Sequence, residues 1–343
     1  MWFLKTLSKE KENEYLNLIK YHVEKNIDKY SQHRDDIKKY LKEKLDVLLI
    51  GHPEELYKLS KDLILKNFKN NNHYKRWKTI KQSRKKISSN LLKKYEFVEK
   101  IFNYNSIMQI KPNKNESEET ISYKIAKIIG IRVCVYCNRQ YTFTIIGKNK
   151  SQNGIIRPQF DHYLPKSIYP FFALSLYNLI SSCSICNSLK GDRDIDKIEG
   201  IENQNFKDVK MNPYIDKDKV DDLFKFSYYP NKYGEPEEIK IIQTKNKSYK
   251  NKVDAFLKLF KIEEIYNAHI DCEVKDLYTF ATKYSDTYLQ SLLGQIGIYF
   301  RLSQEDAYRI LFGTEFDSKN DNNRPLSKLK RDLLEELGVI HKK

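Results

Sequence analysis

The chain has 343 residues, of which 40% are apolar, and a formal net charge of +16 at pH 7. This length and apolar fraction allow a sizeable core divided over two or three parts, and the low counts of Gly (11) and Pro (9) argue against a loop-dominated β protein. No run of about 18 apolar residues occurs and the N-terminus is charged too early for a secretory signal, so we expect a cytoplasmic protein without a membrane span.

Residues 1–120 are expected to form a helical N-terminal region. Apolar residues recur there at steps of three and four, as amphipathic helices require: Leu16, Ile19, Val23, Ile27, Tyr30, Ile37, Leu41, Leu45 and Leu48. Pro53, followed by two glutamates, marks the start of a further helix. Residues 75–100 carry ten Lys or Arg against two Glu. This stretch either follows a nucleic-acid backbone or forms a solvated helix face. Residues 111–120 read as a polar linker, and 121–129 as a short helix ended by Gly130.

Two cysteine pairs carry most of the information in the sequence. Each pair encloses two residues, and 45 residues separate the pairs, which are Cys134 with Cys137 and Cys183 with Cys186. Such spacing predicts one tetrahedral zinc site closed by four thiolates, and a closed site is structural. Four unrelated buried cysteines and a redox-active pair are the alternatives. In a reducing compartment the pairs should bind metal and not form disulfides. The fifth cysteine, Cys272, lies in an apolar helical pattern and is expected in the core.

Polar residues between and after these pairs are of the types that hold a hard cation and deprotonate water. Residues 155–162 read as a packed strand ending in Asp161 and His162, after an earlier strand at 141–146. Neighbouring side chains on a strand point to opposite faces, so one residue can bind a cation while the other addresses a water. The next short strand begins at Asn178, and a helix over 183–192 carries Asn187 on its first turn. These residue types indicate a metal-dependent nuclease.

The order CxxC, Asp-His-x-x-Pro-Lys, Asn-Leu-Ile, CxxCN and Lys-Gly-Asp over residues 134–192 resembles the HNH endonuclease family, which has a ββα-metal fold. The resemblance implies that His162 is the general base and that Asp161 and Asn187 bind a catalytic divalent ion, Mg²⁺ or another. It also implies that Asn178 ties the loop to the backbone near the base. Asn187 replaces the final His of the family pattern, and its amide oxygen still suits a hard cation.

Nearby cations are expected to hold the phosphates that flank the cleaved bond. Lys190 has the best claim because it lies three residues after Asn187 on the same predicted helix. Lys166 and Arg193 either contact phosphate or lie on a solvated surface. The net positive charge favours nucleic acid, specifically double-stranded DNA, as the partner, although AT-rich coding alone can enrich a chain in Lys, Asn and Ile.

The region 216–343 is expected to begin with a hairpin, with strands at 224–228 and 239–242 and a turn at 231–234, and to continue as helices from 249 with breaks near Gly313 and at 318–325. Residues 211–242 resemble the continuation found in bacterial anti-phage HNH nucleases of the Septu type. That resemblance implies an antiviral defence effector working with an ATPase partner.

The expected fold is therefore α+β: a mostly helical chain around a central zinc-stapled ββα-metal core, divided into residues 1–120, 121–215 and 216–343. The expected function is that of a metal-dependent DNA endonuclease. Two alternatives remain open: a zinc-stapled nucleic-acid-binding module without catalysis, and a scaffold subunit that mainly binds a partner.

Overall fold

The computed structural model describes residues 4–31, 34–67, 77–81, 83, 95–112, 119–147, 154–193, 212–214, 223–243, 247–284, 288, 291–292, 294–295 and 303–339. Over these ranges the chain combines helices with small two-stranded antiparallel sheets, which agrees with the expected mixed class. None of the helices in these ranges has both the length and the apolar composition needed to cross a membrane.

Several sequence expectations concern residues outside these ranges. Most of the basic stretch 75–100, most of the linker 111–120 and most of the loop 147–154 lie outside the described residues, as does the expected boundary near residue 215.

The chain divides into two compact units. Unit 1 comprises Met1–Phe3, Ile131–Thr142 and Asp216–Lys343, and unit 2 comprises Leu4–Gly130 and Phe143–Ile215. The division thus differs from three consecutive parts, since unit 1 combines a short central segment with the C-terminal third of the chain.

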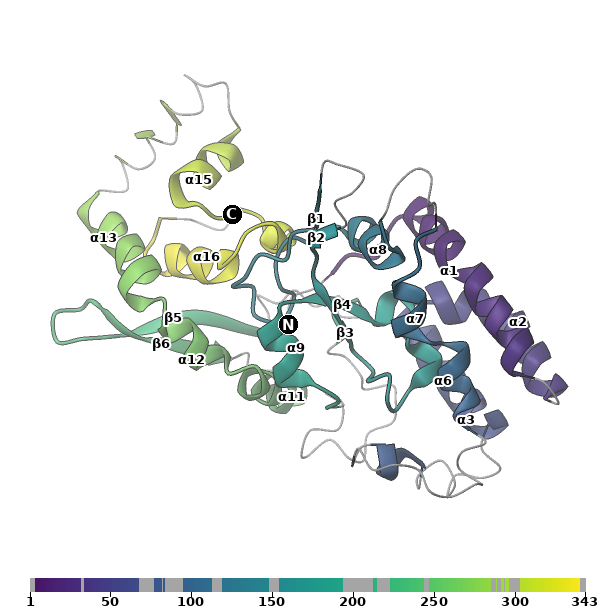
Figure 1. Ribbon diagram of the computed structural model, residues 1–343. Coiled ribbons are helices and arrows are strands. Elements are labelled where there is room, and N and C mark those ends of the chain that lie inside the picture. The colour runs from purple at the N-terminus through teal and green to yellow at the C-terminus, as the bar shows by residue number, and fades with distance from the viewer. Residues whose placement is uncertain are drawn as a thin grey trace. The chain divides into compact units, whose positions relative to one another are not determined.

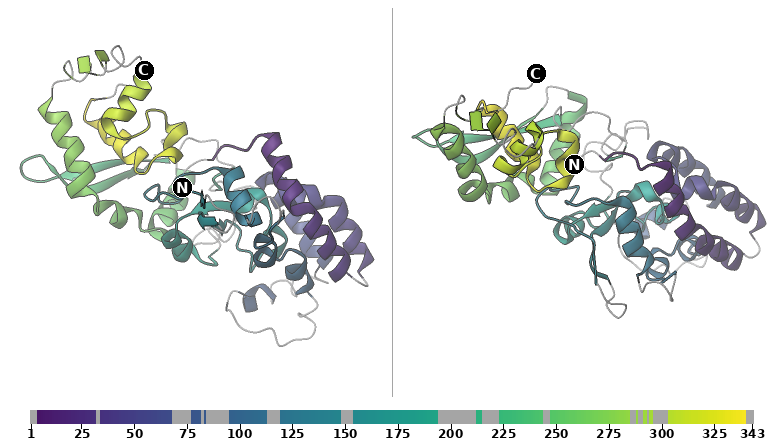
Figure 2. Two further views of the ribbon diagram at one scale, coloured as in Figure 1. Left: turned by 45° about the horizontal axis from the view of Figure 1, so that its top comes forward. Right: turned by 90° about the horizontal axis from the view of Figure 1, so that it is seen from above.

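Unit 2 begins with helices whose positions follow the predicted periodicity. They are α1 (Lys9–Tyr30), α2 (Asp35–Ile50), α3 (Pro53–Asn67), α6 (Phe97–Ile101), α7 (Tyr104–Met108) and α8 (Ile121–Ile129). The side chain of Ser8 caps α1, and Gly130 ends α8 at a φ of 67°, a left-handed conformation that glycine adopts readily. Helices α1 and α2 pack side by side, as Figures 1 and 2 show.

These N-terminal helices are bonded to the loop that separates the two central strands of unit 2. Tyr15 on α1 donates its hydroxyl to the carbonyl of Leu174 at 2.8 Å, and Ser175 donates to the carbonyl of Leu48 on α2 at 2.5 Å. Both bonds are buried. The expected boundary near residue 120 therefore falls inside a single compact unit.

The central strands of unit 2 are shorter than expected. Strand β1 (Ile145–Ile146) pairs with β2 (Gly154–Ile156), and β3 (Gln159–His162) pairs with β4 (Leu179–Ser182), which is followed by α9 (Ser184–Lys190). The strand predicted over 155–162 is broken before β3, where Pro158 has no N–H to donate to a partner strand. Its first part is not packed, because Ile155 and Ile156 are 58% and 51% exposed.

Unit 1 contains the predicted hairpin and the C-terminal helices. Strands β5 (Phe224–Pro230) and β6 (Pro236–Gln243) pair, each longer than predicted. The helical elements that follow are α11 (Lys247–Leu259), α12 (Ile262–Asn267), the π-helical turn η5 (Ile270–Val274), α13 (Lys275–Lys283), α15 (Gln304–Phe312), the 3-10 turn η6 (Ser318–Asn323) and α16 (Ser327–Glu336). The expected break near Gly313 is present, and Gly313 caps α15 in a left-handed conformation. The expected break at 318–325 separates α15 from α16 but contains the 3-10 turn η6.

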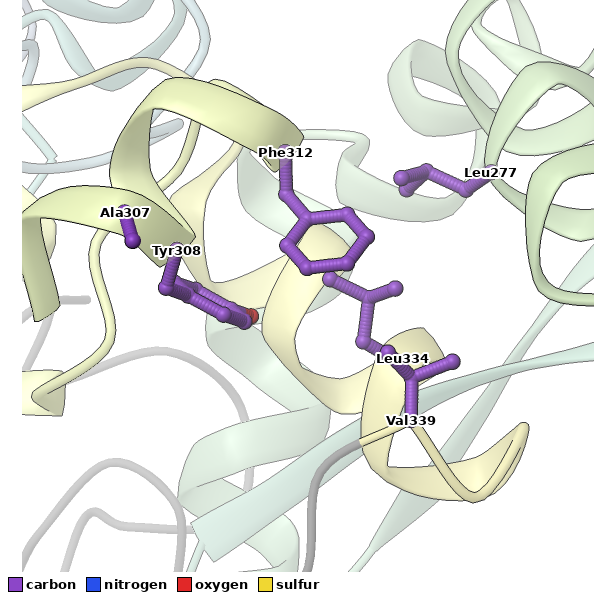
Figure 3. Packing of buried hydrophobic residues seen from close by; sticks show 6 residues of the cluster. All are labelled: Leu277, Ala307, Tyr308, Phe312, Leu334 and Val339. Carbon is purple, nitrogen blue, oxygen red and sulfur yellow. The ribbon is translucent and has the colours of Figure 1, made fainter. Parts of the chain in front are cut away.

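One apolar core of unit 1 joins its last helices. Phe312 of α15 points toward Leu334 of α16, and Leu277 of α13 completes the cluster (Figure 3). The ring of Phe312 also meets Phe280 edge to face, with centroids 5.6 Å apart. Burial of these side chains explains why the periodic pattern of the C-terminal sequence forms packed helices.

Candidate active site and metal centre

Four cysteines form a cluster that could hold a metal ion. Cys134, Cys137, Cys183 and Cys186 are all buried, and their sulfur atoms lie within 4.8 Å of one another. Thiolates about 2.3 Å from a tetrahedral Zn²⁺ lie about 3.8 Å apart, so the donor set and its spacing fit zinc. The remaining cysteine, Cys272, is exposed, which contradicts the expectation of a core position.

The first cysteine pair lies on a tight turn within unit 1. The N–H of Asn138 donates to the carbonyl of Cys134 at 2.9 Å, and Asn138 has a φ of 47°, a conformation that asparagine tolerates. Tyr136 stacks on Phe260 at 4.4 Å, and the hydroxyl of Tyr266 donates to the carbonyl of Cys137 at 2.7 Å. The turn is therefore held by aromatic residues from the C-terminal part of the chain.

The second cysteine pair lies at the start of α9. Cys183 is the N-cap residue, and its sulfur accepts the N–H of Cys186 at 3.5 Å. A helix start presents free N–H groups and a partial positive charge, which favour thiolates. This placement agrees with the prediction that the pair sits where a strand gives way to a helix.

The segment β3–β4–α9 brings the predicted site residues into one strand–strand–helix arrangement. Asp161 pairs with Ile180 and His162 with Leu179 in the antiparallel register. Helix α9 packs on the face of β3 that carries Gln159 and Asp161. On that face Asn187 donates its amide to Gln159 at 2.7 Å. That bond uses the NH₂ group of Asn187 and leaves its amide oxygen, the atom suited to a hard cation, outside the bond.

His162 points to the other face of β3, as the strand alternation predicts. Its Nε2 lies 2.9 Å from the carbonyl oxygen of Ala173, and its ring meets Tyr104 edge-on with centroids 4.6 Å apart. Because a carbonyl only accepts, Nε2 carries the proton and Nδ1 of the neutral ring carries the lone pair. Burial, aided by the charge of Lys166, lowers the pKa of His162 to about 3, so the ring is neutral at pH 7.

Asn178 forms a buried set of backbone bonds around the loop that follows His162. Its Oδ1 accepts the N–H of Leu164 at 2.7 Å, and its Nδ2 donates to the carbonyls of Leu164 and Phe172 at 3.1 and 2.9 Å. Phe172 immediately precedes the residue whose carbonyl bonds His162. The amide thus fixes both ends of the loop that orients the imidazole.

The sequence did not predict that Lys190 is buried. It has no exposed surface, and its ammonium lies 3.2 and 3.1 Å from the two carboxylate oxygens of Asp161. It also donates to the carbonyl of His162 at 2.6 Å. In this arrangement Lys190 neutralises Asp161 inside the protein, so the expected contact with a flanking phosphate does not fit. The helical period predicted that Lys190 lies near Asn187 on α9. It could not predict that β3 covers this part of the helix surface.

Lys166 and Arg193 lie at different parts of this region. The ammonium of Lys166 lies 3.1 Å from Oδ1 of Asn105 and 4.5 Å from the centroid of Tyr104. Arg193 is exposed and donates to the carbonyl of Leu189 at 2.8 Å. Lys166 is half-buried, and of the two cations only Lys166 is close enough to lower the pKa of His162, which burial lowers most.

Sequence reasoning missed the residues of α7 that line the His162 side. Tyr104 contacts both His162 and Lys166, and Asn105 bonds Lys166. Burial raises the pKa of Tyr104 to about 12. These residues precede the motif by more than one helix, and no local pattern linked them to it.

Comparison with protein-family models, curated proteins and solved structures gives no match for the chain.

Proposed function

We propose that the chain is a metal-dependent endonuclease of the HNH class that hydrolyses phosphodiester bonds in double-stranded DNA. The observation that supports this best is the arrangement of donors on β3 and α9: Asp161 and Asn187 serve one face, and His162 serves the other. Phosphodiester hydrolysis needs an activated water and a stabilised leaving oxygen on opposite sides of phosphorus. The net charge of +16 suits a polyanionic substrate.

In this proposal His162 accepts the proton of the attacking water through Nδ1. Its Nε2–H is held by Ala173, which fixes the ring orientation. A pKa of about 3 keeps the ring neutral but makes it a weak base. A phosphate anion beside the ring would raise that pKa toward the working pH, because a nearby negative charge favours the imidazolium.

Asp161 and Asn187 would hold the divalent ion, Mg²⁺ or another, through carboxylate and amide oxygens. When bound, such an ion neutralises phosphate charge and stabilises the leaving oxygen. Lys190 already contacts both oxygens of Asp161. A carboxylate has about four lone-pair sites, so the contact with Lys190 does not by itself prevent Asp161 from binding an ion.

A plasmid-nicking assay with Mg²⁺ tests this function. The wild-type protein should convert supercoiled plasmid to the open form, and His162→Ala should be slower by roughly 10² to 10⁴, the usual effect of removing a general base. Arg309→Ala, which alters a half-buried ion pair of α15 in unit 1, serves as the control for handling and fold. Equal rates for wild type and His162→Ala would rule out the proposed base.

A second candidate is a nucleic-acid-binding subunit without catalysis. The observation that favours it is the buried ion pair of Lys190 with Asp161, which satisfies the carboxylate without any divalent ion. This candidate predicts that duplex DNA is bound but never cut, whatever divalent ion is added.

We also propose that the metal of the four-cysteine cluster is Zn²⁺ in a structural role, since all four positions are thiolates and none is left for water. Metal analysis should give one zinc per chain, and Cys183→Ser should lower that content. A role in antiviral defence and an ATPase partner follow only from the sequence likeness and are tested by co-purification with neighbouring gene products. Cytoplasmic residence, expected from the sequence, is tested by cell fractionation.

A further inference from the structure

Lys166 is held at the edge of the candidate site in an unusual way. Its ammonium rests over the ring of Tyr104 at 4.5 Å and bonds Oδ1 of Asn105 at 3.1 Å, and both partners are neutral. Burial lowers the pKa of Lys166, and the charge of Asp192 opposes that shift. The two groups that contact the ammonium directly, the ring of Tyr104 and the amide of Asn105, are neutral and hold it without cancelling its charge, which leaves it able to attract an anion.

The residues that hold Lys166 belong to a fixed element. Helix α7 is capped by Asn103, whose Oδ1 accepts the N–H of Ser106 at 3.0 Å. Ile107 and Met108 on the same helix are buried and anchor it in the core of unit 2. A platform built on an anchored helix restricts the lysine to few rotamers, which favours a defined contact.

The same tyrosine also contacts the proposed general base. The ring of Tyr104 meets His162 at 4.6 Å and carries Lys166 at 4.5 Å. An anion bound by Lys166 would therefore lie on the His162 face of β3, away from the face that carries Asp161. Lys166 is close enough to depress the pKa of His162, which is consistent with this proximity.

We propose that Tyr104 and Asn105 of α7 are positioning residues that hold Lys166 ready to bind a backbone phosphate of the DNA on the His162 side. This inference rests on the proposed function and assigns α7, which lies outside the motif, a part in substrate binding. Tyr104 acts through Lys166 and through packing on His162, not on the reacting atoms.

Binding to a short duplex, measured by fluorescence anisotropy over a series of salt concentrations, tests the inference. All variants are made in the His162→Ala background so that the DNA stays intact. Lys166→Ala should weaken binding by about tenfold, as expected for one charge-assisted contact, and should reduce the slope of log Kd against log salt by about 0.9. Tyr104→Leu should reproduce both changes. The double variant should be no weaker than either single variant, because both act on one contact.

Two controls separate positioning from folding and from net charge. Tyr104→Phe keeps the ring and should keep the salt slope, while circular dichroism checks that Tyr104→Leu is folded. Lys39→Ala removes an exposed lysine of α2 and should leave the slope unchanged. An equal slope change for Lys39→Ala would mean that net charge alone governs binding, and would overturn the inference.

Amine acylation read by mass spectrometry gives a second measurement that needs no cleavage. DNA should protect Lys166 from acylation, and Tyr104→Leu should abolish that protection. A duplex that binds without protecting Lys166, or fails to bind at all, would overturn the inference. The nicking comparison with His162→Ala fails separately if the chain is not a nuclease, so the two failures are distinguishable.

Discussion

Each unit contains a buried lysine–aspartate pair, and the two pairs have different surroundings. In unit 1, Lys328 lies 2.9 Å from Asp332 one turn along α16, and the side chains are 0% and 1% exposed. In unit 2, Lys190 lies 3.1 Å from Asp161 across α9 and β3, with exposures of 0% and 4%. The charge chemistry and the burial are nearly the same.

The neighbours of each carboxylate differ. Asp332 accepts the N–H of Phe226 on β5 at 2.9 Å, and the ammonium of Lys328 lies 5.4 Å from the ring of Phe224. Asp161 instead shares a face of β3 with the exposed Gln159, which accepts a hydrogen bond from the half-buried Asn187 of α9. A buried ion pair therefore identifies a functional site only together with the groups beside it, and the pair in unit 1 reads as structural.

The largest expected effect comes from breaking the pair in unit 1. Lys328→Met leaves Asp332 buried without its cation and should lower the free energy of unfolding by about 3 to 5 kcal/mol. Urea denaturation followed by circular dichroism measures this loss. Adding Asp332→Asn removes the negative charge of residue 332 but keeps an oxygen that accepts the N–H of Phe226. The double variant should therefore recover most of the lost free energy of unfolding. A loss below about 1 kcal/mol for the single variant would contradict the buried pairing.

Acidification should distinguish the two regions. His162 has its folded-state pKa lowered to about 3 from 6.5, so below pH 6.5 the unfolded chain takes up a proton that the folded chain excludes. The neutral imidazole of His162 therefore makes its full contribution to the free energy of unfolding above pH 6.5. This contribution is lost as the pH falls toward 3, and about 2 kcal/mol of it is lost at pH 5. Burial raises the pKa of Asp332, so acid relieves the cost of its buried charge.

Amide hydrogen exchange at pH 7 and 5 measures this difference locally. Protection should fall more in β3 and β4 than in β5 and α16, and His162→Gln should remove the excess loss. Equal losses in both regions would contradict the pKa assigned to His162.

A divalent ion should restore stability to the Lys190→Met variant but not to the Lys328→Met variant. Lys190→Met removes the internal cation from Asp161, and a bound Mg²⁺ can then supply positive charge next to the same carboxylate. At ten times its Kd the ion should return about 1.4 kcal/mol of stability, measured by urea denaturation. Lys328→Met should show no such gain, because the group that contacts Asp332 from β5 is the N–H of Phe226, which donates a hydrogen bond and cannot bind a cation. An equal Mg²⁺ effect on both variants would remove the distinction between the pairs.

The smallest effect is expected from a solvent-accessible pair between β5 and α16, the helix that carries the buried pair of unit 1. Lys225 on β5 lies 3.2 Å from Glu335 on α16, and the lysine side chain is 49% exposed. Lys225→Ala should change the free energy of unfolding by no more than about 0.5 kcal/mol, since solvent screens such pairs. A loss comparable to that of Lys328→Met would mean that pairing, and not burial, sets the size of the effect.

Local sequence patterns predicted where the helices and strands lie, but not which of their faces are buried. Periodicity located α1 and α2, and a single glycine located the end of α8, because these signals depend on nearby residues only. The turn type of η5 was not foreseeable: a π-helical turn shifts side chains around the axis, and Cys272 in that turn is exposed instead of packed.

The candidate site was predicted only where its residues follow one another closely. The positions of Asp161, His162 and Asn187 on β3 and α9 agree with the sequence expectation. The burial of Lys190 and the approach of Tyr104 depend on how distant segments pack, which no single-chain pattern encodes. Assignment of their chemical roles remains a prediction.

The residues that bond the first cysteine pair decide whether this turn can keep its structure outside the full chain. Tyr266 bonds the carbonyl of Cys137 from 129 residues downstream, and the amide of Asn138 donates to the carbonyl of Asp321 at 2.9 Å. A fragment of residues 121–215 would keep the four clustered cysteines. It would lose the hydrogen bonds with Tyr266 and Asp321 that hold this turn. A fragment that is to keep the first cysteine turn in place therefore needs the C-terminal third of the chain as well.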